Sequence, residues 1–488
     1  MKKTAILIRD TLCEQYIVDF IENVMHDFEV YLVHIPEKKT FKELFYDFVF
    51  SLEKKLYKNK TVDLKELCHD KFLTLSELEN KKDITLFAFD NSFANLFPNH
   101  ELILLDLSEK TAFWEVYARK DSVGFSILLL NQGEKKLLFE GKIATFRSVT
   151  QTKERVFRES LVYVKDILKN GGKKRGEKDT VLKEKKIPNA LEILLYGLKT
   201  LWLYLKLFYT RVVQKKYTRF SVGFLYGGYK KLESDKGFEI RPPKYHFFAD
   251  PFVWSKDDRD ICFLEDYDYQ TGIACISAVE LFEDGSYKLL GEVLRESFHL
   301  SFPYLFEYQN NLYMMPEASQ SKAVKLYKCK EFPMKWEFEQ DIMSGVNTAD
   351  SMVFPLDDKW WLLTNMATKG NYDQSAQLFA FYSDSPLSQK WTVHKQNPVV
   401  FDSKTGRNGG IVFDKNDIIR VRQKQKFGIY GAEFTMAKIK KLTTDEYEEE
   451  LVYEVGEDFF KNINATHHLN SNGKITVYDF MRLERIDR

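Results

Sequence analysis

The hydrophobic and polar positions of the first 168 residues alternate between two periods. Short apolar runs such as TAILIRD, FEVYLVHI and ELILLDL have the length of buried strands. Amphipathic stretches lie between such runs, for example EQYIVDFIENVMHD at 14–27. This order predicts an α/β domain with a largely parallel sheet. No GxGxxG and no GxxxxGK[ST] follows any of these strands, so the residues of a dinucleotide or P-loop site are missing.

The second half of this domain resembles the formyltransferase catalytic fold. The likeness rests on FWEVYARKDSVGFSILLLNQGEKKLLFEGK, which begins at Phe113, and on the helical stretch 154–168. Formyltransferases of that family use an Asn, a His and an Asp. No His lies between Leu104 and Phe113, and the loop 131–136 has no Asp. We therefore expect residues 1–168 to have lost formyl transfer.

Residues 169–216 contain a basic linker and then an apolar helix. The linker, KNGGKKRGEKDTVLKEKK, carries eight basic and three acidic side chains, a composition typical of a solvated segment. Asn189 is placed to cap a helix in which Glu192, Lys199 and Lys206 recur every seven residues and form a narrow polar stripe. Apolar and aromatic side chains cover the rest, so this helix needs an apolar partner.

Two partners suit this helix. Each lysine within it costs roughly 2.5 to 3.5 kcal/mol at the centre of a bilayer, which disfavours a membrane-spanning position. A position in the membrane interface, with basic flanks, suits the same pattern, and we expect a helix on the membrane surface. A helix packed between two domains, or in the seam of a dimer, stays open.

From residue 217 to 488 one pattern recurs: a short apolar strand, a polar turn and a second apolar strand that ends in a polar residue. The copies begin at DPFVW (Asp250), FPYLF (Phe302), DSMVF (Asp350) and GIVF (after Gly409), and a worn copy follows His467. Because the copies start about 50 to 60 residues apart and hold only strand and turn signals, we predict an all-β five-bladed β-propeller. The segment RFSVGFLYG, 219–227, is expected to complete the last blade.

Propeller geometry brings the ends of equivalent strands to one mouth of the central channel. The polar residue that ends the second strand lies 15 positions after the start of the first three copies, at Glu265, Glu317 and Asn365, and the last two copies end at Gln423 and Asp479. We expect the acidic members to share a small cleft with Asp250 and Asp350. Repulsion and burial there raise the pKa of some carboxylates and leave others ionised, as acid/base chemistry requires.

Several segments resemble one known family. HFFADPFVW, FLEDY, ESFHLSFPYLFE, YMMPEAS and TADSMVF are similar to the amino-terminal propeller domain of the glucosamine inositolphosphorylceramide transferase family, and the likeness spans residues 240–480. More distantly, the DP-type starts resemble five-bladed glycoside hydrolases such as family 43. The resemblance implies work on a carbohydrate or a glycolipid. In the plant members, transferase chemistry belongs to a further domain, for which we expect no counterpart in this sequence.

The resemblance also implies where functional residues lie. The family's DPF aspartate is Asp250, its strand-end glutamate is Glu265, its HLS histidine is His299 and its PES glutamate is Glu317, with Asp350 as the third acidic position. Three motifs differ here. The family's Arg-Pro-Ala-Gly becomes Arg407-Asn408-Gly409-Gly410, its Pro-Ala-Gln becomes Val421-Arg422-Gln423, and its Gly-Thr-His-Thr becomes Ala465-Thr466-His467-His468.

We expect three catalytic residues: Asp250, Glu317 and Asp350. The residues expected to bind substrate are Glu265, His299, Asn365, Arg407, Gln423, His467, His468 and Asp479. In a transfer reaction one carboxylate deprotonates an acceptor hydroxyl while Arg407 and His468 hold an anionic donor. No metal site is expected, because the histidines lack HExxH-like spacing. The alternative that these acids merely cap strand ends and turns stays open.

Composition restricts the partners and the location. Lys and Arg (72) balance Asp and Glu (72), so no net basic field attracts nucleic acid. Five cysteines without CxxC spacing predict neither a disulfide framework nor a zinc site. The apolar run 5–8 is too short for a signal peptide, so we expect a cytoplasmic protein, peripheral at the inner face of the plasma membrane. The pattern makes no prediction of the oligomeric state.

Together these patterns predict an α/β domain (1–168), a basic linker and apolar helix (169–216) and a five-bladed propeller (217–488). The expected function is transfer of a sugar or phospho-substituent to a cell-envelope polysaccharide or glycolipid in the propeller cleft. The expected partners are a glycan or lipid-linked saccharide and a membrane surface; an activated sugar or phospho donor suits this reaction, and no cofactor is firmly implied. Two alternatives stay open: a glycoside hydrolase of the five-bladed type and a non-catalytic glycan-binding scaffold.

Overall fold

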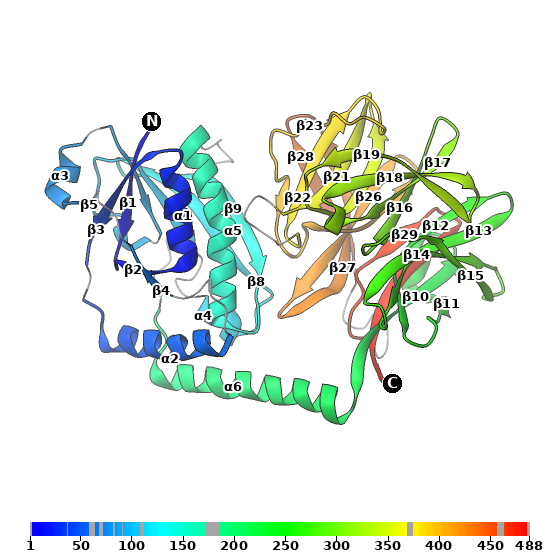
Figure 1. Cartoon of the computed structure of the whole chain (residues 1–488), viewed down its shortest axis with the longest axis horizontal. Coiled ribbons are helices and arrows are strands. Elements are labelled where there is room, and N and C mark those ends of the chain that lie inside the picture. The colour runs from blue at the N-terminus through cyan, green and yellow to red at the C-terminus, as the bar shows by residue number, and fades with distance from the viewer. Residues whose placement is uncertain are drawn as a thin grey trace. The chain divides into compact units, whose positions relative to one another are not determined.

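The computed structural model divides the chain into two compact units, essentially residues 1–205 and 206–488 (Figure 1). The structure describes residues 2–36, 38–57, 64–67, 72–81, 83–89, 91–107, 112–171, 186–367, 374–455 and 463–485. Most of the predicted basic linker, residues 172–185, lies outside the described residues. The domain boundaries predicted at 168 and 216 stay predictions.

The first unit is built on a seven-stranded sheet of order β5-β3-β1-β6-β7-β8-β9. Its strands are β1 (Lys3–Ile8), β3 (Glu29–His34), β5 (Phe72–Leu73), β6 (Thr85–Ala88), β7 (Leu102–Leu107), β8 (Ser122–Asn131) and β9 (Glu134–Ala144). Pairing is parallel from β5 to β7 and antiparallel for β8 and β9. Both faces of the central strand β1 are buried, which is why it reads as one apolar run. A separate short pair joins β2 (Leu12–Glu14) to β4 (Leu64–Glu66).

Six α-helices are described in this unit: α1 (Gln15–Met25), α2 (Phe41–Tyr57), α3 (Leu75–Glu79), α4 (Phe113–Tyr117), α5 (Val149–Asn170) and α6 (Ala190–Phe208). The predicted cap of α6 is confirmed. The Glu192 amide donates to Asn189 Oδ1 at 3.0 Å, and the Asn189 amide donates to the Glu192 carboxylate at 2.7 Å. None of the described helices combines the length and the apolarity that crossing a bilayer requires.

The second unit is mostly β-sheet. The first sheet contains, in chain order, β12 (His246–Lys256), β13 (Arg259–Asp268), β14 (Ile273–Leu281) and β15 (Tyr287–Leu294). The second contains β16 (Ser301–Tyr308), β17 (Asn311–Glu317), β18 (Ala323–Glu331) and β19 (Lys335–Ser344). The third contains β20 (Thr348–Leu356), β21 (Lys359–Met366), β22 (Gln377–Ser383) and β23 (Thr392–Val393), and β24 (Val400–Phe401) also pairs with β22. An eight-stranded sheet has the order β11 (Phe238–Ile240), β10 (Lys216–Tyr226), β30 (Ile475–Arg485), β29 (Leu469–Ser471), β25 (Arg407–Asp414), β26 (Asp417–Lys426), β27 (Ile429–Leu442) and β28 (Tyr447–Glu454).

The ends of this unit are closed by pairing between distant segments. Strand β10 pairs antiparallel with β30 from Lys216↔Arg485 to Tyr226↔Ile475, as predicted for residues 219–227. The first strands of successive groups also contact one another, β12 with β16, β16 with β20, β20 with β25, β25 with β29 and β29 with β12. Among the described residues, one ladder pair, Val412↔Ser471, joins the strands of the two halves of the eight-stranded sheet. Division of that sheet into two blades stays a prediction.

A β-bulge recurs near the start of four strands. The register shifts between Ala249 and Phe252 in β12, and at the corresponding steps of β16, β20 and β25. In the first three strands the second residue of the bulged motif has a left-handed backbone: Asp250 (φ 49°), Phe302 (φ 47°) and Asp350 (φ 47°). Such residues cost about 1–3 kcal/mol each and persist only where their surroundings hold them. The repeated DPF, FPY and DSM motifs are therefore bulges that redirect a side chain.

Candidate functional site

The structure brings the four predicted carboxylates into one cluster of the second unit. Asp250 lies on β12, Glu265 on β13, Glu317 on β17 and Asp350 on β20. Asp250 feels the charges of Glu265 and Asp350, and Glu317 feels those of Asp350 and Asp250. The left-handed bulges of β12 and β20 set the position of Asp250 and Asp350, and both side chains are more than nine-tenths buried.

Arg407 joins two of these carboxylates. Its Nε donates to Asp350 Oδ2 at 2.5 Å, and its Nη2 donates to Glu317 Oε2 at 3.3 Å. Gln423 Nε2 donates a further bond to Asp350 Oδ2 at 3.0 Å. The guanidinium and the amide therefore donate to the same carboxylate oxygen of Asp350 and hold it in place.

Glu317 lies beside Asp350 and Arg407. Burial, followed by the neighbouring Asp350, raises the pKa of Glu317 well above its ordinary value, although Arg407 opposes the shift. A carboxyl group with a raised pKa is suited to act as an acid.

Asp250 holds the least satisfied oxygen of the cluster. Its Oδ1 is buried and makes no hydrogen bond within the described part of the chain. The nearest imidazole nitrogens are His468 Nδ1 at 3.6 Å and His467 Nε2 at 3.7 Å. Burial, with repulsion from Glu265 and Asp350, raises the pKa of Asp250 against the attraction of His467. A buried polar atom without a partner marks a place where a ligand atom is expected.

His467 is a buried cation. Its Nδ1 lies 2.7 Å from Asp479 Oδ2. Burial disfavours the positive charge of the imidazolium and lowers the pKa of His467. The charge and the hydrogen bond of the neighbouring Asp479 together have the larger effect and raise this pKa to about 9. Asp479 also accepts the backbone amides of His467 at 3.0 Å, His468 at 3.1 Å and Asp250 at 3.2 Å. Its contacts therefore position these residues, and its role in binding substrate stays a prediction.

His468 lies in apolar surroundings. Its ring packs edge-on against Phe252 and Phe302, with centroids 4.7 and 5.2 Å apart. Burial lowers the pKa of His468 to about 3, so the ring is neutral. A neutral imidazole does not attract an anion by charge, so this position gives no support to the predicted role in holding an anionic donor.

Asn365 is engaged by the backbone. Its Nδ2 donates to the carbonyls of Gln377 and Gly406, and its Oδ1 accepts the Asn408 amide at 2.8 Å. Asn408, which the sequence analysis did not single out, donates in turn to the Asp350 carbonyl at 2.7 Å. The two asparagines therefore fix the backbone of the Asp350 bulge, while Gln423 reaches the carboxylate itself.

Glu265 and His299 form a separate pair, with Oε1 and Nε2 3.1 Å apart. His299 is about one-third exposed, whereas Glu265 is buried. Burial opposes the charge on the imidazole, but the bond to Glu265 raises the pKa of His299. The pair offers a donor and an acceptor for sugar hydroxyl groups beside Asp250.

Tyr430 on β27 is a site residue that sequence reasoning missed. The Arg407 guanidinium lies 5.5 Å from its ring centroid, and the His467 ring packs edge-on at 6.1 Å. Burial of the hydroxyl, with the charges of Asp350 and Glu317 against that of Arg407, raises the pKa of Tyr430. Half of Tyr430 is exposed, so its ring presents an open aromatic face. Tyr430 lies in the segment GIYG, 428–431, which no candidate of the sequence analysis includes.

Two glycines make room for His467. A Cβ atom on Gly431 would lie 2.8 Å from the Cβ of His467, and the backbone of Gly431 is left-handed (φ 54°). A Cβ atom on Gly409 would lie 2.4 Å from the His467 carbonyl oxygen. Gly409 and Gly431 are therefore packing requirements of His467.

One group in the cluster has the spacing of metal ligands. Ligand atoms of Asp250, His467 and Asp479 lie within 4.8 Å of one another. His467 carries a proton at neutral pH, and Asp479 already accepts three backbone amides. Both would have to give up these partners to bind a cation, so the residues fit a metal poorly and we assign none.

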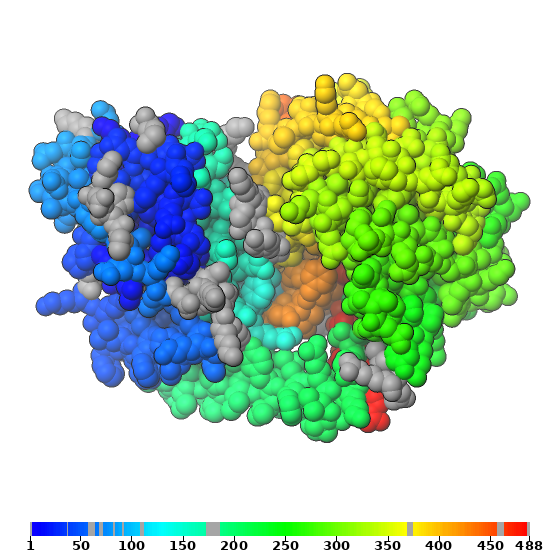
Figure 2. Space-filling view, viewed as in Figure 1, coloured from blue at the N-terminus to red at the C-terminus, as the bar shows by residue number. Residues whose placement is uncertain are grey.

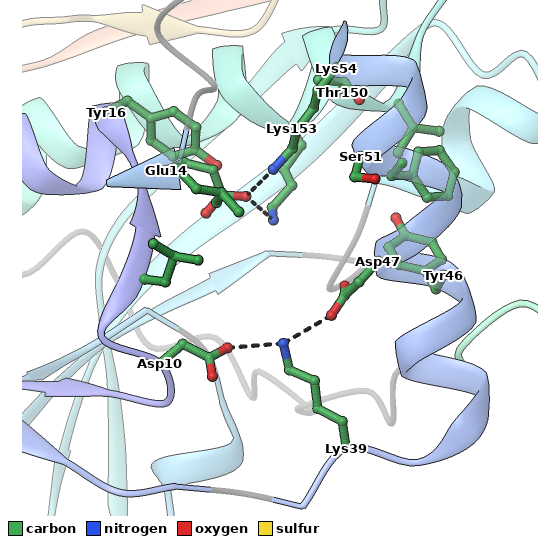
Figure 3. Close-up of a pocket in the computed structure, with 14 residues that line it drawn as sticks. Asp10, Glu14, Tyr16, Lys39, Tyr46, Asp47, Ser51, Lys54, Thr150 and Lys153 are labelled. Carbon is green, nitrogen blue, oxygen red and sulfur yellow. Dashed lines mark hydrogen bonds and ion pairs between the residues drawn. The ribbon is translucent and has the colours of Figure 1, made fainter. Parts of the chain in front are cut away.

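A second cavity, of about 350 Å³, lies in the first unit beside β2, α2 and the start of α5 (Figure 3). Glu14 pairs with Lys54 at 3.0 Å and Lys153 at 3.1 Å. Burial alone would raise the pKa of Glu14, but the two lysines lower it to about 2. Across the cavity, Lys39 pairs with Asp10 and Asp47, both at 2.9 Å. These charges neutralise one another, so they select no ligand class, and loss of formyl transfer stays a prediction.

Comparison with known proteins relates the second unit to one family. The family model that matches residues 236–479, half of the chain, is described as Glucosamine inositolphosphorylceramide transferase 1, N-terminal. A relative named Glucosamine inositolphosphorylceramide transferase 1 from Oryza sativa subsp. japonica is 33% identical over 247 residues, 48% of this chain and 33% of its own. Its namesake from Arabidopsis thaliana is 33% identical over 208 residues, 42% of this chain and 27% of its own. The chain thus spans a third or less of these relatives' length.

Solved structures with a distant likeness are glycoside hydrolases. A family 117 enzyme from the marine bacterium Zobellia galactanivorans aligns with 55% of this chain and 92% of its own, at 14% identity and a TM-score of 0.35. The catalytic domain of a GH62 α-L-arabinofuranosidase from Coprinopsis cinerea aligns with 52% of this chain and 84% of its own, at 12% identity and a TM-score of 0.34.

Proposed function

Because the chain belongs, through residues 236–479, to the family described as Glucosamine inositolphosphorylceramide transferase 1, N-terminal, we propose that it is a transferase acting on a glycolipid or cell-envelope polysaccharide. The membership confirms the resemblance that the sequence motifs indicate. The proposed reaction moves a sugar or phospho-substituent from an activated donor to a hydroxyl group of the acceptor. Since the match covers a third or less of the named relatives' length, their whole activity is carried over only as part of this proposal.

The observation that carries the proposal is that three carboxylates with different hydrogen-bond partners, Asp250, Glu317 and Asp350, lie in one cluster. Glu317, whose pKa is raised, gives a proton to the leaving group, while Asp350, held by Arg407, stabilises positive charge at the reacting carbon. Asp250, with its unpartnered Oδ1, takes the proton of the acceptor hydroxyl when ionised. Burial makes it a stronger base in that form, because its pKa is raised. The Glu265–His299 pair and Tyr430 hold the sugar.

The same carboxylates support a second candidate, hydrolysis of a glycosidic bond. In that reaction Asp250 activates water in place of an acceptor hydroxyl, and Glu317 again protonates the leaving group. Release of reducing sugar from a panel of chromogenic glycosides by the purified chain supports hydrolysis. Transfer without such release supports the transferase.

We also propose that the second unit is a five-bladed propeller. The support is the circle of contacts among β12, β16, β20, β25 and β29, with the eight-stranded sheet divided at its single β25–β29 pair. In that arrangement the first strands line a central channel, and the carboxylate cluster lies at its mouth. We likewise propose a cytoplasmic location at the inner face of the plasma membrane. The exposed apolar side chains of α6 support association with the membrane.

The test compares cell-envelope glycans by mass spectrometry from cells that carry the wild-type chain, Asp250→Asn or Glu317→Gln. We expect both variants to lose one discrete substituent mass, because each removes one proton-transfer group. Exposed carboxylates give the matched controls Asp358→Asn and Glu337→Gln, which are expected to leave the profile unchanged. An unchanged profile in the site variants at normal protein levels contradicts a catalytic propeller and favours the glycan-binding scaffold.

A further inference from the structure

Helix α6 presents an apolar surface that nothing in the described chain covers. Only Ile193 and Tyr196 are buried on the helix. The large apolar side chains exposed before the end of the first unit are Leu191, Leu194, Leu195, Leu198, Leu201, Trp202, Tyr204 and Leu205. Their spacing of three and four residues places most of them on the face opposite Tyr196. A helix of a water-soluble unit normally buries this face.

Helix α2 has a second exposed stripe, which the sequence analysis did not identify. Its members are Phe41, Leu44, Phe48, Leu52 and Leu56, spaced three or four residues apart. Phe41 and Leu56 are each more than four-fifths exposed. The inward side of the helix is formed by Phe50, which is buried. Thus α2 buries Phe50 and partly buries Phe45, Tyr46 and Val49, while the stripe from Phe41 to Leu56 is exposed to solvent.

The two helices lie next to each other. The ring centroids of Phe50 on α2 and Tyr196 on α6 are 5.8 Å apart, and the Tyr196 hydroxyl donates to Glu53 Oε1. Figure 1 shows α2 and α6 running side by side, and Figure 2 shows their blue and green atoms along one surface of the first unit. We call the exposed stripes of α2 and α6, as defined above, the two-helix face.

The segment that contains α6 and continues to the start of β10 is predominantly basic, although α6 itself carries only Lys199 and Lys206 against Glu192. The segment from Ala190 to Lys216 contains five basic residues, Lys199, Lys206, Arg211, Lys215 and Lys216, against the single acid Glu192. The whole chain is balanced, so this excess is local. Trp202 and Tyr204 are of the types that concentrate at the boundary between headgroups and acyl chains. Basic and aromatic residues beside an apolar stripe complement an anionic lipid surface.

We propose that the two-helix face docks on a bilayer containing anionic lipids, with the α2 stripe and the α6 stripe both entering the interface. The inference deepens the proposed membrane location and rests on it for its setting. It assigns α2, as well as the helix recognised in the sequence, to lipid binding. Docking of this kind places the chain where a lipid-linked acceptor is concentrated, without a membrane-spanning helix among those described.

The test is vesicle flotation of the full chain, which requires no transferase reaction. Vesicles contain phosphatidylcholine alone or phosphatidylcholine and phosphatidylglycerol in equal parts. We expect binding to the anionic vesicles that weakens with added salt. Phe48→Gln with Leu52→Gln on α2, and Leu198→Gln with Trp202→Gln on α6, should each reduce binding about tenfold or more, because each removes two side chains that insert. The control pair, Leu289→Gln with Phe338→Gln, removes equally exposed residues of the second unit and should bind as wild type.

Three outcomes would overturn the proposal. If the α2 double variant binds the vesicles as well as the wild-type chain does, α2 does not contact the lipid. No flotation of the wild-type chain, with a dimer in light scattering that the same variants dissociate, makes the face a contact between two copies. Equal loss in the control pair makes the effect non-specific. Because glycan analysis tests the proposed reaction separately, lipid binding without transfer, or transfer without lipid binding, identifies which proposal has failed.

Discussion

Arg407 is the residue on which the charge balance of the site depends. It is the cation that faces both Asp350 and Glu317. Without it, two buried carboxylates face each other with only Gln423 as a donor to Asp350. Removing one partner of a buried ion pair leaves an uncompensated charge, which is more costly than never having had the pair.

We expect Arg407→Gln to reduce stability by about 3–5 kcal/mol and to abolish transfer. Urea unfolding of the purified chain measures the first effect, and glycan analysis measures the second. Arg407→Lys keeps the charge but loses the fork that reaches two carboxylates, so an intermediate stability is expected. If Arg407→Gln unfolds at the wild-type midpoint, the ion pair does not stabilise the fold.

His467 predicts a pH dependence of stability. Its pKa rises from 6.5 in the unfolded chain to about 9 in the fold, so the folded state binds the proton more tightly. The resulting stabilisation, roughly 3 kcal/mol, is fully present below pH 6.5 and is lost as the pH rises through 9. Urea unfolding between pH 6 and 10 should show this decline in the wild-type chain and a flatter profile in His467→Gln. Parallel profiles would contradict the assignment.

At the scale of elements, the strands that carry the site depend on tight turns around it. Gly431 combines a left-handed backbone with contact to the His467 side chain. Gly345 provides a matched position, because its backbone is left-handed (φ 73°) and a Cβ atom there meets nothing within 4 Å. The pair separates the cost of the backbone conformation from the cost of crowding the site.

We expect Gly431→Ala to destabilise the chain by about 1–3 kcal/mol more than Gly345→Ala does. The difference should come with loss of glycan modification in Gly431→Ala alone, since only that substitution displaces His467. Thermal and urea unfolding, with glycan analysis, measure both. Equal effects would mean that His467 moves aside without cost.

In the first unit, Glu14 ties β2 to both α2 and α5. Its pKa of about 2, against 4.5 unfolded, gives stability that is present above pH 4.5 and lost as the pH falls toward 2. We expect Glu14→Gln to cost roughly 3 kcal/mol at pH 7 and to remove the acid sensitivity of this unit. Circular dichroism during acid titration compares the two chains, and equal acid midpoints would contradict the prediction.

The sequence pattern predicted the carboxylate positions, but it did not predict Tyr430, the cavity of the first unit or the exposed stripe of α2. The fixed spacing from Asp250 to Glu265 and from Phe302 to Glu317 indicated which strand ends share a site, because strand geometry repeats. Tyr430 was missed because nothing in its own segment says which distant strands surround it. The cavity of the first unit was missed because its ion pairs join Glu14 to residues 40 and 139 positions away. The α2 stripe was missed because periodicity finds an apolar face but not whether it is covered.

At the scale of the whole molecule, the two compact units predict two separable stabilities. The carboxylate cluster lies entirely in the second unit, whereas the two-helix face as defined lies in the first. Their roles in catalysis and in lipid docking are therefore expected to be independent in isolated pieces.

We expect residues 206–488 to fold alone and to show the pH dependence attributed to His467. Residues 1–205 should show the acid sensitivity attributed to Glu14. Calorimetry of the full chain should resolve two transitions that match those of the pieces. A single transition, absent from both pieces, would show that the units fold only together.

The bulge shared by Asp250, Phe302 and Asp350 has a consequence for how such proteins diversify. One backbone shape accepts a carboxylate in two repeats and a phenyl ring in the third, although all three have the same left-handed conformation. The architecture therefore does not depend on which side chain occupies the turn. A single substitution at such a position changes the chemistry of the site while the neighbouring repeats keep the frame, so new substrates are accessible in small evolutionary steps.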